Sequence, residues 1–185
     1  MGRLLRYGGV VASVILIAIG LASVYMGVDG RSTVRGDLAR EQIVGTQDSS
    51  IPGQKVDSGS EAKAFAAVMR KHTLEATGGQ TYSQMGRFLD DNGKATDDEA
   101  AAAKDPKTGQ PVENAARNIW ISSTAFQTAL NTAYFAESVA TFVLVIGIAL
   151  ILVGIGLLIL TVRLLDRRAP RAAAAHAPNT VPAAG

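Results

Sequence analysis

The chain has 185 residues, 48% of them hydrophobic, and a formal net charge of +2. It contains no cysteine, which excludes disulfides, thiolate metal sites and thiol nucleophiles within the chain. The basic residues in excess lie beside hydrophobic segments near the two ends, where anionic lipid headgroups attract them, so the charge does not indicate nucleic-acid binding.

The first hydrophobic segment runs from Tyr7 to Val28 and holds twenty-two residues without a charge. As a helix it would cover roughly 33 Å, enough to cross a hydrocarbon core of about 30 Å. The apolar run is longer than the roughly 7 to 15 residues of a signal peptide, which favours a retained span over a cleaved one. We therefore expect a transmembrane helix over residues 7–28 after a cytoplasmic N-terminus at residues 1–6, with cleavage as the alternative.

The segment after this span is polar and divides into short elements. Its pattern predicts a helix over Thr33–Val44 and a loop over the turn-rich residues Gly45–Gly59. A further helix is expected from the capping box Ser58-x-x-Glu61 to a stop at Gly78. One face of that helix is an apolar stripe that needs a partner surface: Ala62, Phe65, Ala66, Met69, Thr73 and Ala76.

His72 lies at the edge of this stripe and is the one histidine outside the C-terminal tail. A single histidine in such a place is expected to be a packing residue. An envelope hydrolase would require His72 to act with Asp57, Glu75 or Ser83, and the spacing does not bring these residues together. We therefore expect no catalytic residue and no enzymatic activity.

Two more short helices are expected before the next long one. The pattern predicts helices over Thr81–Leu89 and Asp97–Lys104, the second of them with Thr96-x-x-Glu99 as its capping box. A turn is expected over Lys104–Gln110.

The acidic segment Phe88–Glu99 has part of the spacing of a calcium loop. Its candidate ligands are Asp90, Asn92 and Glu99. Phe88 stands at the first position, where a calcium loop needs an aspartate, so a solvated acidic turn is the favoured interpretation. No metal or other cofactor is therefore expected.

A long helix is predicted from Val112 onward, with Pro111 suited to its first position. It continues without Gly or Pro into Ser138–Val162, twenty-five uncharged residues of which seventeen are Leu, Ile, Val or Phe. These side chains favour membrane insertion by about 5 to 10 kcal/mol at helix-centre values. We expect a second span over residues 138–162, preceded by a stalk of about 39 Å over residues 112–137, on which the short helices pack.

Small residues recur at seven-residue intervals in both hydrophobic segments. They are Ser13, Gly20 and Gly27 in the first, and Ala140, Gly147, Gly154 and Thr161 in the second. Such spacing forms a nearly straight stripe on a helix, and small residues allow two backbones to approach closely. We predict that the stripes face each other in an antiparallel, left-handed hairpin. Chance spacing is the alternative, because Gly and Ala are common in membrane helices.

The distribution of charge predicts the orientation. The residues expected to fix it flank the two spans on their outer sides: Arg3, Arg6, Arg163, Arg167 and Arg168. Residues 29–137 instead hold fifteen acidic and twelve basic residues. The positive-inside rule then places both termini in the cytoplasm and residues 29–137 outside it. Residues 163–185 are expected to form a basic flank and a disordered Ala- and Pro-rich tail.

The middle segment contains several short motifs: Gly53–Gly59, Ala62-Lys63, His72 and Gly78–Tyr82. With these motifs the chain resembles a family of two-span actinobacterial membrane proteins, over roughly residues 31–162. It implies a bacterial plasma membrane and the same two-span topology. The motifs carry no assigned chemistry, so the resemblance implies no mechanism.

The sequence as a whole predicts an all-α membrane protein. We expect an antiparallel two-helix transmembrane hairpin with an extracytoplasmic helical domain packed on a long stalk helix continuous with the second span. The leading hypothesis is a non-catalytic protein whose domain binds a protein partner, as an accessory subunit or by self-association, and no nucleic acid. The alternative is a sensor or ligand-binding module that acts through a partner, with residues 45–59 and 78–81 framing its pocket.

Overall fold

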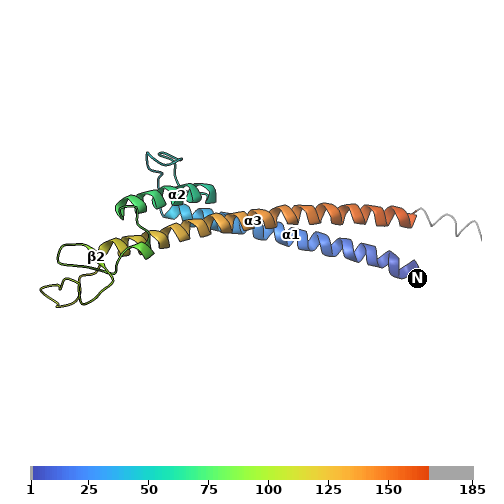
Figure 1. The fold of residues 1–185 in the computed structure, drawn as a ribbon. Coiled ribbons are helices and arrows are strands. Elements are labelled where there is room, and N and C mark those ends of the chain that lie inside the picture. The colour runs from blue at the N-terminus through green and yellow to red at the C-terminus, as the bar shows by residue number, and fades with distance from the viewer. Residues whose placement is uncertain (1, 167–185) are drawn as a thin grey trace, which may run out of the picture. The chain divides into compact units, whose positions relative to one another are not determined.

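The computed structural model describes the backbone of residues 2–166 and, within it, the side chains of residues 7–163. The chain divides into two compact units, which Figure 1 shows as part of one mainly helical chain. The span unit comprises Met1–Asp29 and Ala140–Gly185. The helical domain comprises Gly30–Val139. Two long helices, α1 and α3, contribute to both units, and the shorter helix α2 belongs to the helical domain.

Helix α1 runs from Gly2 to Arg40 without a break. The expectation of a separate helix over Thr33–Val44 is therefore wrong, because that segment is the last part of α1 and the helix ends before Val44. Gly30 and Gly36 follow the hydrophobic segment, and each glycine costs about 1 kcal/mol, too little to break a long helix. The helix ends just before Gln42, whose φ of 53° is left-handed.

Helices α1 and α3 (Ala115–Asp166) are each long and apolar enough to cross a membrane. In each helix, only 11% of the most hydrophobic 18-residue stretch is buried. The core helix of a soluble protein would be mostly buried, so the exposed apolar surface of these two helices fits a lipid environment better. Within the span unit the two helices lie side by side (Figure 1).

Helix α2 (Gly59–Ala76) begins and ends where the sequence predicts. The predicted capping box is confirmed: the Glu61 carboxylate accepts from the Ser58 N–H at 3.0 Å, and Ser58 Oγ accepts from the Glu61 N–H at 3.5 Å. At the other end, Gly78 and Gly79 have φ values of 63° and 79°. Because these left-handed conformations suit glycine, the pair stops the helix.

The core of the helical domain lies between α2, the end of α1 and the first part of α3. Its buried members are Leu38, Val56, Ala62, Phe65, Ala66, Val68 and Leu130. The rings of Phe65 on α2 and Phe126 on α3 meet edge to face, with centroids 6.2 Å apart. Within the stripe expected on α2, Ala76 is exposed, and Val68 is buried instead. Helix α2 therefore packs on α3 through most of the face that its periodicity indicates.

The helix expected over Thr81–Leu89 is absent. That segment holds a single 3₁₀ turn, η1 (Tyr82–Gln84), and then strand β1 (Phe88–Leu89). Strand β1 pairs antiparallel with β2 (Ala95–Thr96), with Phe88 opposite Thr96. Two apolar residues of the segment, Phe88 and Leu89, thus lie in a strand pair and not on a helix face.

The helix expected over Asp97–Lys104 is also absent. The segment is rich in alanine, but eight residues are too few to nucleate a stable helix without packing. Its backbone pairs with other segments instead: the Ala103 N–H donates to the Leu89 carbonyl at 2.8 Å and the Val112 N–H to the Ala103 carbonyl at 2.9 Å. The turn expected over Lys104–Gln110 is confirmed by a ladder of backbone hydrogen bonds.

Helix α3 begins at Ala115, so the expected start at Pro111 is wrong. Pro111 lies in an extended bridge, and Asn114 caps the helix by accepting from the Ala116 N–H at 3.1 Å. From there α3 continues without interruption to Asp166. The predicted continuity of the stalk with the second hydrophobic segment is confirmed from Ala115 onward.

Candidate functional site

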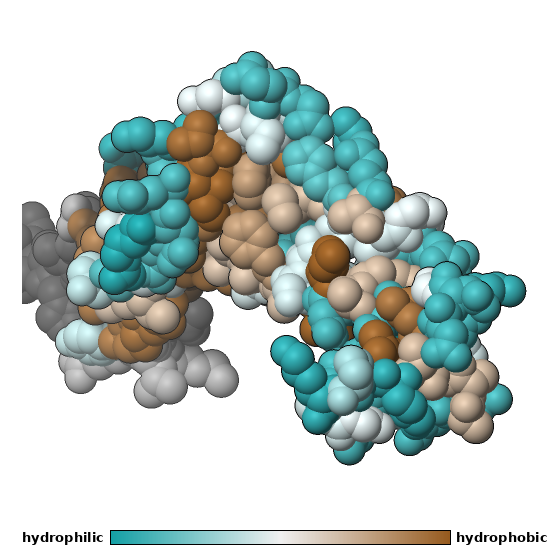
Figure 2. All heavy atoms as spheres, turned by 90° about the vertical axis from the view of Figure 1, so that its left-hand side faces the viewer, coloured by the Kyte–Doolittle hydropathy of each residue, from teal (hydrophilic) through white to brown (hydrophobic). Residues whose placement is uncertain are grey.

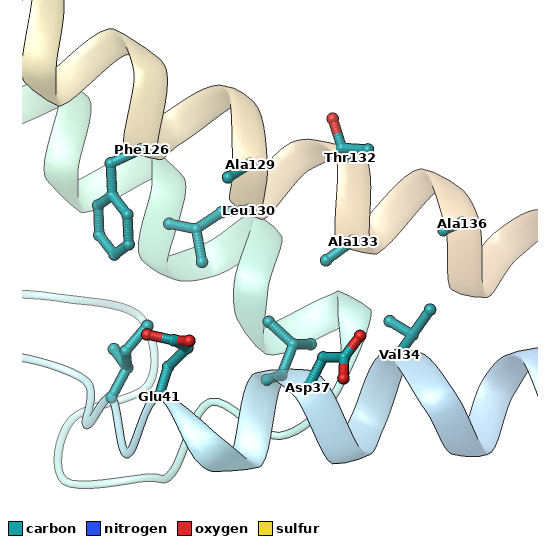
Figure 3. A pocket seen from close by; sticks show the side chains of 11 residues that line it. Val34, Asp37, Glu41, Phe126, Ala129, Leu130, Thr132, Ala133 and Ala136 are labelled. Atoms are coloured by element: carbon teal, nitrogen blue, oxygen red, sulfur yellow. The ribbon is translucent and has the colours of Figure 1, made fainter.

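An open groove lies between the end of α1 and the first part of α3, within the helical domain (Figure 3). Its volume is about 380 Å³. The residues that line it are Val34, Asp37, Leu38, Glu41 and Ile43 from the first segment, and Phe126, Ala129, Leu130, Thr132, Ala133 and Ala136 from α3. Residues three and four apart on a helix share a face, so each helix presents a continuous wall.

The floor of the groove is hydrophobic and belongs to the core of the domain. Leu38 and Leu130 are 7% and 2% exposed, and α2 passes behind Leu130 in Figure 3. Phe126 points from α3 toward α1, and Val34 points from α1 toward α3. Small alanines on the α3 wall leave the space open. The groove is thus an open surface with an apolar floor.

Two carboxylates stand at the α1 edge of the groove. Asp37 and Glu41 are one helical turn apart, and the lining contains no lysine or arginine. Asp37 forms an ion pair with Arg40 on the exposed side of α1. An apolar floor beside a negative edge favours an apolar segment that also carries basic side chains.

Glu137 of α3 joins three segments of the helical domain. Its carboxylate accepts from the Gly59 N–H at 2.5 Å, from Arg35 Nε at 2.8 Å and from Arg31 Nε at 3.3 Å. Burial by itself raises the pKa of Glu137, but the hydrogen bonds from Gly59 and Arg35 outweigh it, and the pKa lies below its ordinary value. The same contact raises the pKa of Arg35. Glu137 therefore stays ionised and ties the first turn of α2 and the end of α1 to α3.

The outward surfaces of α2 and α3 differ in charge. Helix α3 has nineteen consecutive residues without a charge, Asn118–Ala136. Large hydrophobic side chains are exposed on this uncharged stretch, with Ile121 at 50% and Phe135 at 67% exposure. Figure 2, in which the left-hand side of Figure 1 faces the viewer, shows hydrophobic atoms lying between hydrophilic ones. The exposed charged residues of α2 are Lys63, Arg70, Lys71 and Glu75.

His72 contacts a residue that the sequence did not single out. Its Nε2 lies 2.9 Å from the Asp48 carboxylate, which also accepts from Lys71 Nζ at 2.9 Å. The hydrogen bonds from Lys71, His72 and Thr46 lower the pKa of Asp48. This exposed cluster fastens the loop before α2 to the C-terminal half of α2. Asp48 lies in a turn-rich loop without periodicity, so its partner could not be found from spacing.

The small residues predicted to form stripes lie where α1 and α3 meet in the span unit. A Cβ added at Gly20 would come within 2.7 Å of the Gly147 carbonyl oxygen, and one at Gly27 within 2.8 Å of the Ala140 carbonyl oxygen. Such distances leave no room for a side chain, so each glycine brings the two backbones into contact.

The remaining stripe residues lie in the same contact. A Cβ added at Gly154 would lie 3.1 Å from the Ser13 carbonyl oxygen, and one at Gly9 would lie 2.8 Å from Thr161 Oγ1. Both hydroxyls bond within their own helices: Ser13 Oγ donates to the Gly9 carbonyl at 2.7 Å, and Thr161 Oγ1 donates to the Leu157 carbonyl at 2.8 Å. The contact can therefore be apolar although two of its residues are polar.

The candidate calcium ligands do not converge. Asp90 Oδ1 accepts from the backbone N–H groups of Asn92 at 2.9 Å and Lys94 at 2.8 Å, so this carboxylate shapes the turn between β1 and β2. Asn92 and Glu99 are exposed. Among the residues that the structure describes, no three His, Cys, Asp or Glu side chains stand together as a metal site.

The arginines expected to fix the orientation are only partly covered by the structure. Arg3 and Arg6 lie in the first turns of α1, and Arg163 is exposed in the last part of α3. Arg167 and Arg168 lie outside the described residues, as does the tail that follows.

Comparison with protein-family models, with curated proteins and with solved structures finds no match to this chain. The groove, the uncharged face of α3 and the contacts within the span unit are therefore the observations from which a function can be argued.

Proposed function

We propose that this chain is an integral protein of a bacterial plasma membrane that holds a helical domain outside the cytoplasm to bind a protein partner. Helices α1 and α3 would cross the bilayer as an antiparallel hairpin, with both termini in the cytoplasm. The basic residues outside the two spans favour this orientation. The chain would act by binding and not by catalysis.

The groove between α1 and α3 is the observation that carries this proposal. The groove has a volume of about 380 Å³, and its apolar floor lies next to a negative edge. Hydrophobic surface in the middle of a patch and charge at its rim are typical of protein interfaces. The rigid floor, made of side chains shared with the core, keeps the surface formed before a partner arrives, which lowers the entropic cost of binding.

The partner segment that best fits is an apolar helix with basic side chains on one edge. Ala129, Ala133 and Ala136 leave a shallow wall against which a helix can approach closely. Asp37 and Glu41 would then pair with lysine or arginine of the partner. Such a helix could itself continue from a membrane span.

Site-specific photo-crosslinking in intact membranes of the source organism tests the proposal. A photoreactive residue at Ala129, in the groove, is compared with one at Ala67, an exposed alanine on α2. We expect a discrete protein adduct at Ala129 and none at Ala67. The adduct should be lost when Glu41→Lys reverses the charge of the groove edge. Adducts at both positions, or an adduct indifferent to Glu41→Lys, would count against the groove as the binding surface.

A further inference from the structure

We propose that the outward face of α3 binds α3 of a second copy of this chain in a parallel, two-fold symmetric pair. This face adjoins the groove and shares Thr132 with its edge, but the other residues of the face do not line the groove and the partner is a different one. It rests on the proposed function only for the topology, which places every copy in the membrane in the same orientation.

The face is defined by its spacing. Exposed residues follow one another at alternating steps of four and three, and we call them the α3 stripe: Ile121, Ala125, Thr128, Thr132, Phe135 and Val139. This is the 3.5-residue period of a left-handed coiled coil, which keeps one seam facing a partner helix. At 100° per residue the centre of the stripe lies about 180° from buried Leu130, so it points away from α1 and α2.

The stripe exposes large hydrophobic side chains and carries no charge. Ile121, Phe135 and Val139 are 50%, 67% and 43% exposed, and the helix has no charge between Arg117 and Glu137. Exposed faces of helices in soluble domains normally carry charged residues. An uncharged helix face with large hydrophobic side chains exposed at both ends indicates an interaction site.

Lipid alone does not account for the stripe. Phe135 lies just before the second hydrophobic segment and Val139 lies in its first turn, so lipid could cover both. Ile121 lies fourteen residues before Phe135, about 21 Å along the helix axis. The headgroup layer of one leaflet is only about 5 to 8 Å thick, so headgroups that cover Phe135 do not reach Ile121.

The absence of charge favours a second copy as the partner of this face. A parallel two-fold pair sets each residue close to its own counterpart, so any charge on the seam would meet the same charge. The α3 stripe has none. Helix α2 offers no such face, because Lys71 and Glu75 are exposed on it and Lys63 and Arg70 lie over the rings of Tyr134 and Trp120 on α3. The Thr132 hydroxyl donates to the Thr128 carbonyl of its own helix at 2.8 Å, so it can leave water without losing its hydrogen bond. Small side chains at the middle of the stripe allow close approach.

Cysteine crosslinking of the full-length protein in membranes tests this pairing, and the chain has no native cysteine to interfere. Single variants Thr128→Cys, Thr132→Cys and Val139→Cys report on the stripe, with Ala129→Cys and Ser122→Cys as exposed controls beside it. We expect oxidation to give a product of twice the chain's mass at the three stripe positions and only background at the controls. Equal dimer at all positions, dimer at Ala129→Cys alone, or no dimer would overturn the proposal.

A second variant distinguishes specific pairing from collision. Thr128→Arg, added to Val139→Cys, should abolish the dimer because two arginines would meet on the seam, whereas Thr128→Ser should preserve it. Persistence of the dimer with Thr128→Arg would contradict the pairing. A membrane-impermeant maleimide applied to Thr132→Cys separates failure of the pairing from failure of the topology, and Thr128→Arg is added so that a dimer does not hide the introduced cysteine. If Thr132→Cys alone gives no dimer but the cysteine is labelled from outside, the pairing is rejected and the topology stands. If the cysteine is labelled only after permeabilisation, the topology is rejected.

Discussion

The span unit and the helical domain are built from the same two helices but are held together by different contacts. In the span unit, α1 and α3 meet backbone to backbone at glycines, as at Gly20 and Gly147. In the helical domain, the same helices are held apart by large side chains and are joined by polar groups. Leu38 and Leu130 fill the core there, and Glu137 binds across to α1 and α2.

This difference follows from the environment that each composition suits. Lipid gives no hydrophobic driving force between two apolar helices, so close packing of small residues has to hold them. Water does provide that force, so the helical domain can use larger side chains and add charged contacts at its edges. The prediction is that mutations in the span unit act through volume, whereas those in the helical domain act through lost burial and lost hydrogen bonds.

The largest effect is expected from Gly147→Leu. A Cβ at this position would lie 2.8 Å from the Gly20 carbonyl oxygen and 2.8 Å from the Val24 nitrogen, and backbone atoms cannot move aside easily. We expect a loss of about 3 kcal/mol of stability, the upper part of the range for overpacking. Thermal unfolding in detergent, followed by circular dichroism, measures it.

Gly156→Leu is the matched control, because nothing lies within 4 Å of a Cβ added there. Both changes add the same side chain to the same helix, so any difference between them comes from the contact with α1. Equal unfolding temperatures for the two variants would contradict the close backbone contact.

A smaller loss is expected from Glu137→Gln in the helical domain. Glutamine keeps the size of the side chain but lacks the charge that pairs with Arg31 and Arg35, and its amide presents two donors in place of an acceptor. We expect about 2 kcal/mol of destabilisation, since the glutamate side chain is only 10% exposed. Fluorescence of Trp120, the one tryptophan of the chain and 9% exposed, would follow urea unfolding of this domain. Glu75→Gln, which removes an exposed pair with Lys71 at 3.9 Å, should cost little.

The same residue predicts how stability depends on pH. Its folded pKa is lowered, so the unfolded chain binds a proton more readily than the folded one does. The stabilisation from Glu137 is therefore complete above about pH 4.3, the ordinary glutamate pKa, and is lost as the pH falls through the lower folded pKa. Glu137→Gln should show a shallower loss of stability over that acidic range. An identical slope in both proteins would exclude this carboxylate as a source of acid sensitivity.

Periodicity and capping signals predicted α2 and most of α3, because these depend on residues close in sequence, but they did not predict that α1 continues to Arg40. The capping box of Ser58 and Glu61 and the uninterrupted course of α3 could be read in this way. The short helices expected over Thr81–Leu89 and Asp97–Lys104 failed for the opposite reason: their backbone groups pair with distant segments, such as Ala103 with Leu89 and Val112. Local propensity is too weak to decide such short elements.

The candidate binding surfaces show the same limit. The lack of charge from Asn118 to Ala136 was visible in the sequence and marks the uncharged face of α3. The groove was not visible, because it requires knowing which face of α1 meets which face of α3. The partnership of Glu137 with Gly59 joins residues seventy-eight positions apart, and no spacing rule connects them.

The smallest effect is expected at the start of α2, where Ser58→Ala removes one half of the capping box. The Ser58 Oγ atom accepts from the Glu61 N–H at 3.5 Å, a long bond, while the Glu61 carboxylate still accepts from the Ser58 N–H at 3.0 Å. We therefore expect a loss of about 1 kcal/mol, as for other N-caps, again measured by urea unfolding with Trp120 fluorescence. Ser122→Ala, an exposed serine within α3, should cause no loss, because alanine has the higher helix propensity. Glu137 accepts from the N–H of Gly59, which is the first residue after the cap. If Ser58→Ala lowers the free energy of unfolding as much as Glu137→Gln does, the cap and the buried carboxylate act as one unit.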